Sequence, residues 1–176
     1  MKVVCISGKA RHGKDTLAGI LKNHLEDSGN KVLIAHFGDL VKYICEKFFD
    51  WDGQKDEKGR TLLQYVGTDV VRTQEPNFWT GFIKKVLMLF PNEWDYVLIP
   101  DCRFPNEIEC FKDDSFDAYL VRITRPDCDS GLTEQQLKHP SETAMDNYHA
   151  DCYIINDSTM EALEMKIPEI IKVIGG

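Results

Sequence analysis

The chain has 176 residues, of which 43% are hydrophobic and 28% charged, a composition typical of an ordinary soluble globular protein. This length suits one domain, and no apolar stretch approaches the ~20 residues of a membrane span, so we expect a single domain over 1–176 without a signal peptide or membrane segment. The formal net charge of -8 argues against a nucleic-acid partner, which needs a basic stripe, but leaves small phosphorylated ligands open.

The first predicted elements are a buried strand at 3–7, a glycine loop and an amphipathic helix. The strand is a short, β-branched apolar run, as a strand covered on both faces requires. Gly8 and Gly13 allow the loop to turn its N–H groups toward one point, where Lys14 also lies. Leucines and isoleucines at helical spacing follow directly up to Leu25. Strand, glycine loop, lysine and helix in this order predict a phosphate-binding P-loop.

The order of residues inside this loop is informative. A serine or threonine usually follows the lysine directly, but here Asp15 intervenes and the hydroxyl comes at Thr16. This Lys-x-Thr order resembles the loop of adenylate-kinase-type nucleoside monophosphate kinases. Asp15 has two interpretations, an acid favoured by the helix dipole or a water-mediated magnesium ligand. The residues expected to bind the nucleotide phosphates are Gly8, Lys9, Ala10, Arg11, His12, Gly13, Lys14, Asp15 and Thr16.

The next part of the chain is predicted to be mainly helical. A strand at 31–37 leads into a helix over 40–48, for which Asp39 is the expected cap. Strand, helix and strand in this order predict a right-handed crossover within a parallel sheet. Residues 50–60 are polar and contain two glycines, so we expect a loop there. Apolar spacing then predicts two helices between 61 and 90, separated at a proline.

Asp101 ends a third strand, predicted over 94–101. Ligands bind at the carboxyl ends of the strands in open α/β sheets. An apolar strand followed by an aspartate has the form of a Walker B acid, which holds magnesium directly or through water, although strands also end in aspartate for turn reasons. Together with the loop upstream, this position predicts that Asp101 is a magnesium ligand.

The C-terminal part is predicted to add strands at 118–124 and 151–156, followed by a last helix. The segment 126–150 between these strands is polar and contains Gly and Pro, so we expect a lid with a short helix near 133–138. Asp157 or Ser158 is the expected cap of the last helix.

These elements together predict an α/β protein with the three-layer P-loop NTPase fold. We expect about five parallel strands with helices on both faces, and an adenylate-kinase-like lid. The six cysteines form no CxxC pair and no zinc-type spacing with histidines, which indicates free thiols in a reducing compartment. The expected location is the cytoplasm, or the host cytoplasm if the source is a virus.

Several short motifs occur in an order that is typical of one family. They are Gly-Lys-Asp-Thr at 13–16, Gly-Thr-Asp at 67–69, Asp-Cys-Arg-Phe-Pro-Asn-Glu at 101–107, Arg-Pro at 125–126, His-Pro-Ser-Glu at 139–142 and Ile-Asn-Asp-Ser at 155–158. With these motifs the chain resembles the deoxynucleoside monophosphate kinases of bacteriophages and their bacterial relatives over nearly its whole length. The phage enzymes carry a longer insertion after the second strand than residues 50–60 provide.

The resemblance implies transfer of the γ-phosphoryl group of ATP to a (deoxy)nucleoside 5′-monophosphate, with Mg²⁺. Such a transfer needs positioning and charge neutralisation more than covalent chemistry. Lys14 would bridge the β- and γ-phosphates, and Thr16 would contact the α-phosphate. Guanidinium groups match phosphate oxygens, so three arginines are candidate catalytic clamps, with surface ion pairs as the alternative. They are Arg72, Arg103 and Arg125.

The resemblance also implies an acceptor-binding helical region at about 38–92. Phe37 would stack a base or pack in the core, and Lys42 would contact the acceptor phosphate or face solvent. Asn156 would hold the donor adenine or serve a turn. The residues expected to contact the acceptor are Phe37, Asp39, Lys42, Asp69, Arg72, Glu107, His139 and Glu142.

Two other functions fit the sequence. One is a different small-molecule kinase on the same scaffold, of the dephospho-coenzyme A or phosphomevalonate type. The other is a nucleotide-binding switch that transfers no phosphate, against which the arginines argue, because simple binding needs fewer cations. A homodimer is left open, as are the base and sugar of the acceptor.

Overall fold

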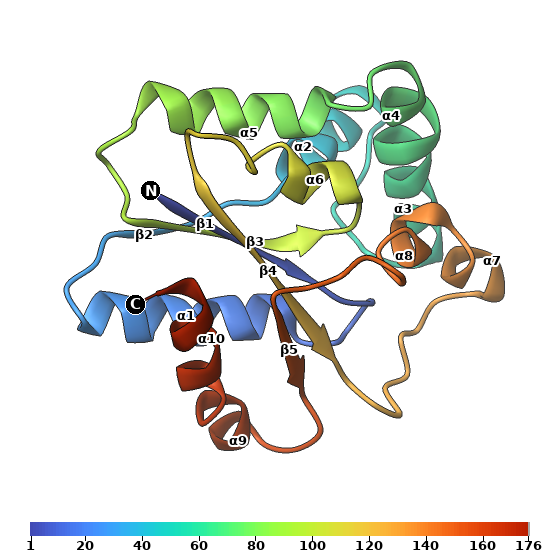
Figure 1. The fold of residues 1–176 in the computed structure, drawn as a ribbon. Coiled ribbons are helices and arrows are strands. Elements are labelled where there is room, and N and C mark those ends of the chain that lie inside the picture. The colour runs from blue at the N-terminus through green and yellow to red at the C-terminus, as the bar shows by residue number, and fades with distance from the viewer. Residues whose placement is uncertain (176) are drawn as a thin grey trace.

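The computed structural model describes residues 1–175, which form a five-stranded parallel sheet of order β2-β3-β1-β4-β5. Its strands are β1 (Lys2–Ser7), β2 (Val32–Ile34), β3 (Tyr96–Cys102), β4 (Asp117–Thr124) and β5 (Cys152–Ile155). All carboxyl ends therefore meet at one edge (Figure 1). The α/β class and the five parallel strands are confirmed.

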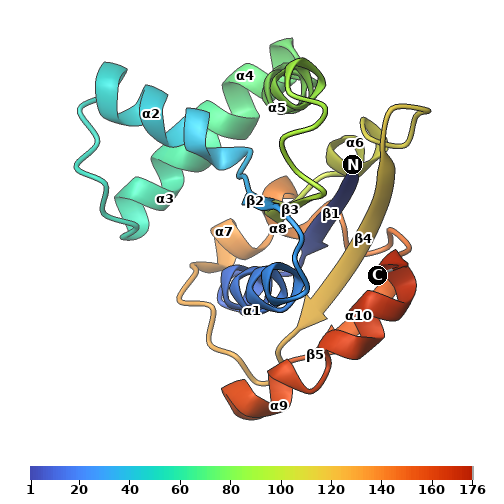
Figure 2. The same ribbon diagram turned by 90° about the vertical axis from the view of Figure 1, so that its left-hand side faces the viewer.

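Helices cover both faces of the sheet, and the alternation along β1 shows why. Val4 and Ile6 point into a core with α1 (Lys14–Asp27), α9 (Met160–Glu164) and α10 (Ile167–Ile174). Val3 and Cys5 point into the opposite core. The helical elements that build or adjoin this second core are α2 (Gly38–Phe48), α3 (Glu57–Gln64), η1 (Tyr65–Val70), α4 (Val71–Gln74), α5 (Phe78–Leu89) and α6 (Pro105–Glu109). The predicted three layers are visible in Figures 1 and 2.

The predicted lid contains two short helices, α7 (Glu134–Leu137) and α8 (Pro140–Thr143). The prediction near 133–138 is confirmed by α7, which Thr133 caps, whereas α8 was not predicted. The Gln136 side-chain amide donates to the Glu57 carbonyl at 3.2 Å and to the Thr61 hydroxyl at 3.3 Å. These contacts join the lid to α3, and Figure 1 shows the lid helices near α3.

Three details before the third strand differ from the prediction. β2 has three residues instead of the seven in 31–37, because the chain turns into α2 at Gly38. Asp39 is not the cap of α2: it lies in the first turn, and the N-cap residue Phe37 makes no side-chain cap bond. The predicted loop over 50–60 ends early, because Asp56 caps α3 through the Gly59 N–H.

The C-terminal helix also differs from the prediction. Neither Asp157 nor Ser158 caps it, since the Thr159 hydroxyl accepts from the Ala162 N–H instead. The helix is split into α9 and α10, with a proline in the first turn of α10. All six cysteines are free, as expected. Within residues 1–175, no helix combines the length and the apolar character that a bilayer crossing requires.

Candidate active site

The loop between β1 and α1 is held in a strained shape that its glycines permit. Gly13 has φ +93°, and a Cβ there would lie 2.6 Å from the Asn156 side-chain nitrogen. Arg11 has φ 61°, which is uncommon for a residue with a side chain. Asn156 donates to the His12 carbonyl at 3.1 Å, so it braces the phosphate loop from β5. This contact favours a supporting role for Asn156 over the predicted adenine contact.

Lys14 is buried at the start of α1, with 7% of its surface exposed. Its ammonium group donates to the Lys9 carbonyl at 2.8 Å. Burial, together with the nearby Arg103 charge, lowers the pKa of Lys14 to about 8. A cation that has lost its water and lies at a helix N-terminus is stabilised by an anion, so the site favours a phosphate beside Lys14.

A cavity of about 340 Å³ opens between this loop, α2, η1 and the end of β3. Seven lysines and arginines but only four carboxylates line it, although the whole chain has a net charge of -8. The cations are Arg11, Lys14, Lys42, Lys55, Arg60, Arg72 and Arg103, and the acids are Asp15, Asp101, Glu107 and Glu142. Local positive charge in an acidic protein indicates a site for a small, multiply charged anion.

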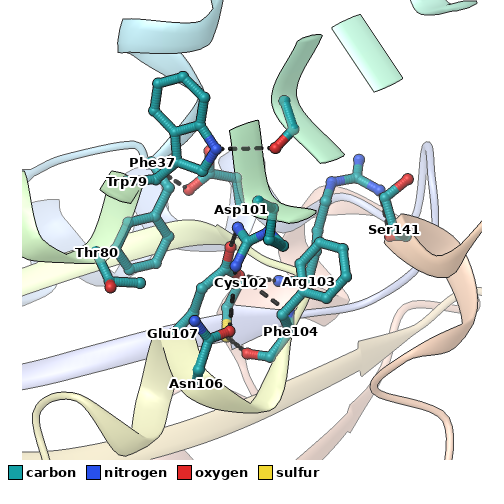
Figure 3. A network of polar contacts seen from close by, with 12 residues as sticks. Phe37, Trp79, Thr80, Asp101, Cys102, Arg103, Phe104, Asn106, Glu107 and Ser141 are labelled. Carbon is teal, nitrogen blue, oxygen red and sulfur yellow. Dashed lines mark hydrogen bonds and ion pairs between the residues drawn. The ribbon is translucent and has the colours of Figure 1, made fainter. Parts of the chain in front are cut away.

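Glu107 organises one wall of this cavity (Figure 3). It is 2% exposed and accepts hydrogen bonds from the Arg103 N–H at 2.5 Å, the Phe104 N–H at 3.0 Å and the Arg72 guanidinium at 2.5 Å. Arg72 also lies over the Phe104 ring, 4.0 Å from its centre. Burial raises the pKa of Glu107 to about 7, against the opposing charge of Arg72. Glu107 therefore orients Arg72, and its oxygens are not free for the predicted acceptor contact.

Asp101 joins the end of β3 to the start of α2. Its two carboxylate oxygens accept from the Phe37 N–H at 3.0 Å and the Gly38 N–H at 2.8 Å. These are N–H groups that a helix leaves without internal partners, so Asp101 supplies the cap that was predicted for Asp39. Figure 3 shows Asp101 above Glu107 at this edge of the sheet.

The residues at the cavity fit a magnesium ion if phosphates and water supply most of its ligands. Among residues 1–175, no group of three or more His, Cys, Asp or Glu side chains is arranged to hold a metal. Mg²⁺ keeps several waters and commonly binds through one or two carboxylates plus substrate phosphates, so no protein cage is required. Asp15, with its side chain 80% exposed, and Asp101, whose oxygens each retain a lone pair, are the carboxylates available at the cavity.

We expect Asp101→Asn to lower the free energy of unfolding by about 1–2 kcal/mol, because one amide oxygen replaces two carboxylate oxygens that accept N–H groups. Urea unfolding measures this loss. A magnesium ligand would add a second effect, an increased magnesium requirement in the activity assay. An unchanged magnesium titration would restrict Asp101 to holding α2.

A histidine that the sequence analysis missed connects two of the predicted residues. His36 Nε2 lies 3.0 Å from an Asp15 carboxylate oxygen, and Nδ1 lies 3.6 Å from Asp39. The hydrogen bond to Asp15 raises the pKa of His36, and the same contact lowers the pKa of Asp15. Lys42 binds Asp39 at 2.7 Å and lines the cavity. These charged side chains lie at the solvent side of the first cavity.

Arg103 and Glu142 meet where the lid covers the loop. Arg103 donates to the Ser141 carbonyl at 2.9 Å and also to the Glu142 carboxylate. The other Glu142 oxygen accepts from the Ala10 N–H at 3.1 Å. A second cavity of about 280 Å³ lies behind this contact, lined by Lys9, His12 and Arg122 among others. Arg103, Ser141 and Glu142 line both cavities.

The other predicted residues lie outside the first cavity or inside the core. Arg125 is exposed after β4 and lines neither cavity found in residues 1–175, and Thr16 is exposed on α1. His139 and Asp69 bind each other at 3.1 Å. Phe37 is 4% exposed and stacks on Phe111 in the core, although its edge reaches the cavity wall.

Six polar residues of the cavity were missed by the sequence analysis. They are His36, Lys55, Arg60, Gln64, Thr68 and Ser141. Lys55 and Arg60 lie in the segment predicted as a loop, and only the folding of α3 against the lid brings them to the cavity. In the sequence, only their positive charge could have indicated a binding role. Charged residues are equally common in surface loops without a binding role.

A glycine loop on the central strand, a lysine at the start of the next helix and two arginines around one cavity define a P-loop kinase. In agreement, the fold matches an APS kinase of Mycobacterium tuberculosis, solved in complex with AMPPNP and APS, with a TM-score of 0.55. That alignment covers 99% of this chain and 98% of the other at 14% identity, so it shows the fold alone.

The sequence defines the family more narrowly. The family model described as deoxynucleotide monophosphate kinase matches residues 41–167, and the chain belongs to this family. A mimivirus protein provisionally named deoxynucleotide monophosphate kinase is 27% identical, over 95% of this chain and 94% of its own length. The deoxynucleotide monophosphate kinase of phage T4 is 29% identical over 93% of this chain, which spans 63% of the phage protein. The predicted family resemblance is confirmed.

Proposed function

We propose that the chain transfers the γ-phosphoryl group of ATP to a (deoxy)nucleoside 5′-monophosphate, giving ADP and the nucleoside diphosphate. The single observation that carries this proposal is the cation-rich cavity that adjoins the phosphate loop in an acidic chain. Membership in the deoxynucleotide monophosphate kinase family supports the same reaction. The cavity adds an acceptor site to the donor site, which a nucleotide-binding switch does not need.

In the proposed reaction, the loop from Gly8 to Thr16 and Lys14 hold the donor phosphates. An oxygen of the acceptor phosphate attacks the γ-phosphorus, and the bond from the γ-phosphorus to the bridging oxygen of ADP breaks. Arg72 and Arg103 hold the acceptor phosphate and the transferring group, because both guanidinium groups line the cavity beside Lys14. Their fixed positive charge neutralises the equatorial oxygens as the bond breaks. Arg125 lies outside this arrangement.

Magnesium, when bound with ATP, would supply further neutralisation of the phosphate charge. Asp15 and Asp101 are the residues that would hold it, in part through water. We also propose that residues 38–92 form the acceptor-binding region and residues 126–150 the lid of one domain. The contacts of Gln136 with α3 support this division, since they join the lid to the wall of the acceptor cavity.

The test is ADP formation with ATP and magnesium against a panel of deoxyribo- and ribonucleoside monophosphates, dephospho-coenzyme A and phosphomevalonate. We expect at least one deoxynucleoside monophosphate to stimulate ADP formation strongly and to appear as its diphosphate. Stimulation by dephospho-coenzyme A or phosphomevalonate alone would favour the other kinase types. If no acceptor stimulates ADP formation, the switch interpretation replaces the proposal.

We expect kcat/KM for ATP to fall as the pH rises through about 8. The pKa of Lys14 is lowered to about 8 in the free protein, so above this pH the lysine loses the charge that binds the phosphates. Bound phosphates favour the protonated lysine, so kcat at saturating ATP should remain constant to a higher pH than kcat/KM. Initial rates between pH 6 and 10 measure both parameters. A constant kcat/KM across this range would contradict the assignment of Lys14.

A further inference from the structure

The His-Pro-Ser-Glu segment at 139–142 connects separate parts of the site. Its contacts reach η1 through His139 and Asp69 at 3.1 Å, and α3 through the Ser141 hydroxyl, which accepts from Gln64 at 3.4 Å. At its other end, the Ser141 carbonyl and the Glu142 carboxylate accept from Arg103, and Glu142 also accepts from Ala10. A single helical turn therefore connects the acceptor wall with the phosphate loop and the arginine.

Glu142 is the central residue of this connection. Its side chain is 4% exposed, so the carboxylate has exchanged its water for two protein donors. One donor is the Ala10 backbone in the phosphate loop, and the other is the Arg103 guanidinium from the β3–α6 connection. Neither donor comes from the lid, so Glu142 joins the phosphate loop to the β3–α6 connection from a third segment of the chain. Removing one partner of such a buried pair leaves the other without compensation.

The sequence predicted Glu142 as an acceptor contact, and the geometry disagrees. The buried carboxylate points its two oxygens at protein donors, and its negative charge repels the phosphate of a nucleotide. Arg103, in contrast, keeps 31% of its side chain exposed at the wall that the two cavities share. The arginine faces the ligand, and the glutamate fixes the arginine.

We propose that Glu142 is a positioning residue, which holds the Arg103 guanidinium at a fixed place relative to the phosphate loop. This inference rests on the proposed function, in which Arg103 contacts the transferring phosphoryl group. Because phosphoryl transfer depends on placement of charge, a displacement of about 1 Å is enough to lower the rate by about 10²-fold. Glu142 therefore affects kcat indirectly, by positioning Arg103.

The central experiment compares Glu142→Gln with the wild-type protein. Glutamine keeps the size of the side chain but has one acceptor oxygen, so it serves either Ala10 or Arg103 and not both. We expect kcat to fall by about 10²-fold, while KM for ATP and for the acceptor change by less than about threefold. Glu134→Gln is the matched control. Glu134 lies on α7 of the same lid segment, is exposed and lines neither of the two cavities, so its kcat should stay within about twofold of the wild type.

A double-mutant cycle tests whether Glu142 acts through Arg103. If it does, Glu142→Gln combined with Arg103→Ala should have the same kcat as Arg103→Ala alone, within about twofold. Multiplication of the two single effects would overturn the proposal, as would an unchanged kcat in Glu142→Gln. A lower KM for ATP in Glu142→Gln would also overturn it, since the carboxylate would then be competing with phosphate for the loop.

The melting temperatures of the same four proteins keep this test separate from the proposed function. If the wild-type protein phosphorylates no nucleoside monophosphate, the proposed function fails, whatever Glu142 does. The contact itself predicts that the melting temperature of the double variant falls by less than the sum of the two single decreases. Additive decreases would show that Glu142 does not hold Arg103.

Discussion

Lys14→Ala should lower kcat/KM by at least about 10²–10³-fold, the effect of removing one preorganised charge that stabilises the transition state. Lys14 lies at the start of α1 and is buried beside Arg103, so no other lysine reaches the same place without moving the loop. The fold should remain intact, because within residues 1–175 the lysine ammonium donates only to the Lys9 carbonyl. Steady-state rates and a melting curve together measure this prediction.

Lys22→Ala serves as the control for this variant. Lys22 lies on the same helix but pairs with Glu26 and the Val32 carbonyl on the far side from the cavity, so its loss should not affect turnover. Unfolding of Lys14→Ala would show that the lysine is structural. Turnover within about threefold of the wild type would remove Lys14 from the reaction.

Glu107→Ala should lower the free energy of unfolding by about 3–5 kcal/mol, as breaking a buried ion pair typically does. The substitution leaves the Arg72 guanidinium, whose side chain is 11% exposed, without its carboxylate. It also removes the acceptor of the Arg103 and Phe104 N–H groups. Denaturant unfolding at pH 8, where Glu107 is ionised, measures the loss.

Glu109→Ala is the matched control on the same helix, because Glu109 is exposed. Its free energy of unfolding should stay within about 0.5 kcal/mol of the wild type, as for most surface substitutions. Equal losses in the two variants would contradict the central role given to Glu107. The pH dependence provides a second check. The pKa of Glu107 is raised to about 7, so its contribution to stability should decrease as the pH rises from about 4.5 to 7.

The sequence predicted the phosphate loop well because the loop is local. Gly8, Gly13 and Lys14 lie within seven residues, and a strand and a helix flank them directly. The sheet was also predictable, since a strand buried on both faces appears as a continuous apolar run. Both features depend on residues that are close together in the chain, so a sequence pattern can reveal them.

The cap of α2 shows where local reasoning fails. Asp39 stands where a capping residue is expected, yet the N–H groups of Phe37 and Gly38 bind Asp101 on another strand. A carboxylate from another part of the chain accepts from these N–H groups. The local sequence does not show which aspartate will lie at the start of α2, because the tertiary fold decides this. The predicted magnesium ligand and the missed cap are the same residue.

The Gly-Thr-Asp motif presents a similar case. It lies in η1, a π-helical segment whose wider turn no propensity predicts. Gly67 faces Val41 of α2, where an added Cβ would lie 3.2 Å from the valine side chain, and its carbonyl accepts from Trp79 at 2.8 Å. These contacts arise only when α2 and α5 pack on the segment, so the motif was recognisable but its shape was not.

The place of β1 in the sheet has a consequence for ligand capture. β1 is paired on both sides, with β3 and with β4, whereas β2 and β5 form the edges. Local opening begins at the edges, so the backbone amides of β1 should be among the slowest to exchange with deuterium. The loop that β1 carries starts from this well-held strand and is braced by the contacts of Ala10 with Glu142 and of His12 with Asn156. Little conformational entropy is therefore lost in ordering the loop when a nucleotide binds.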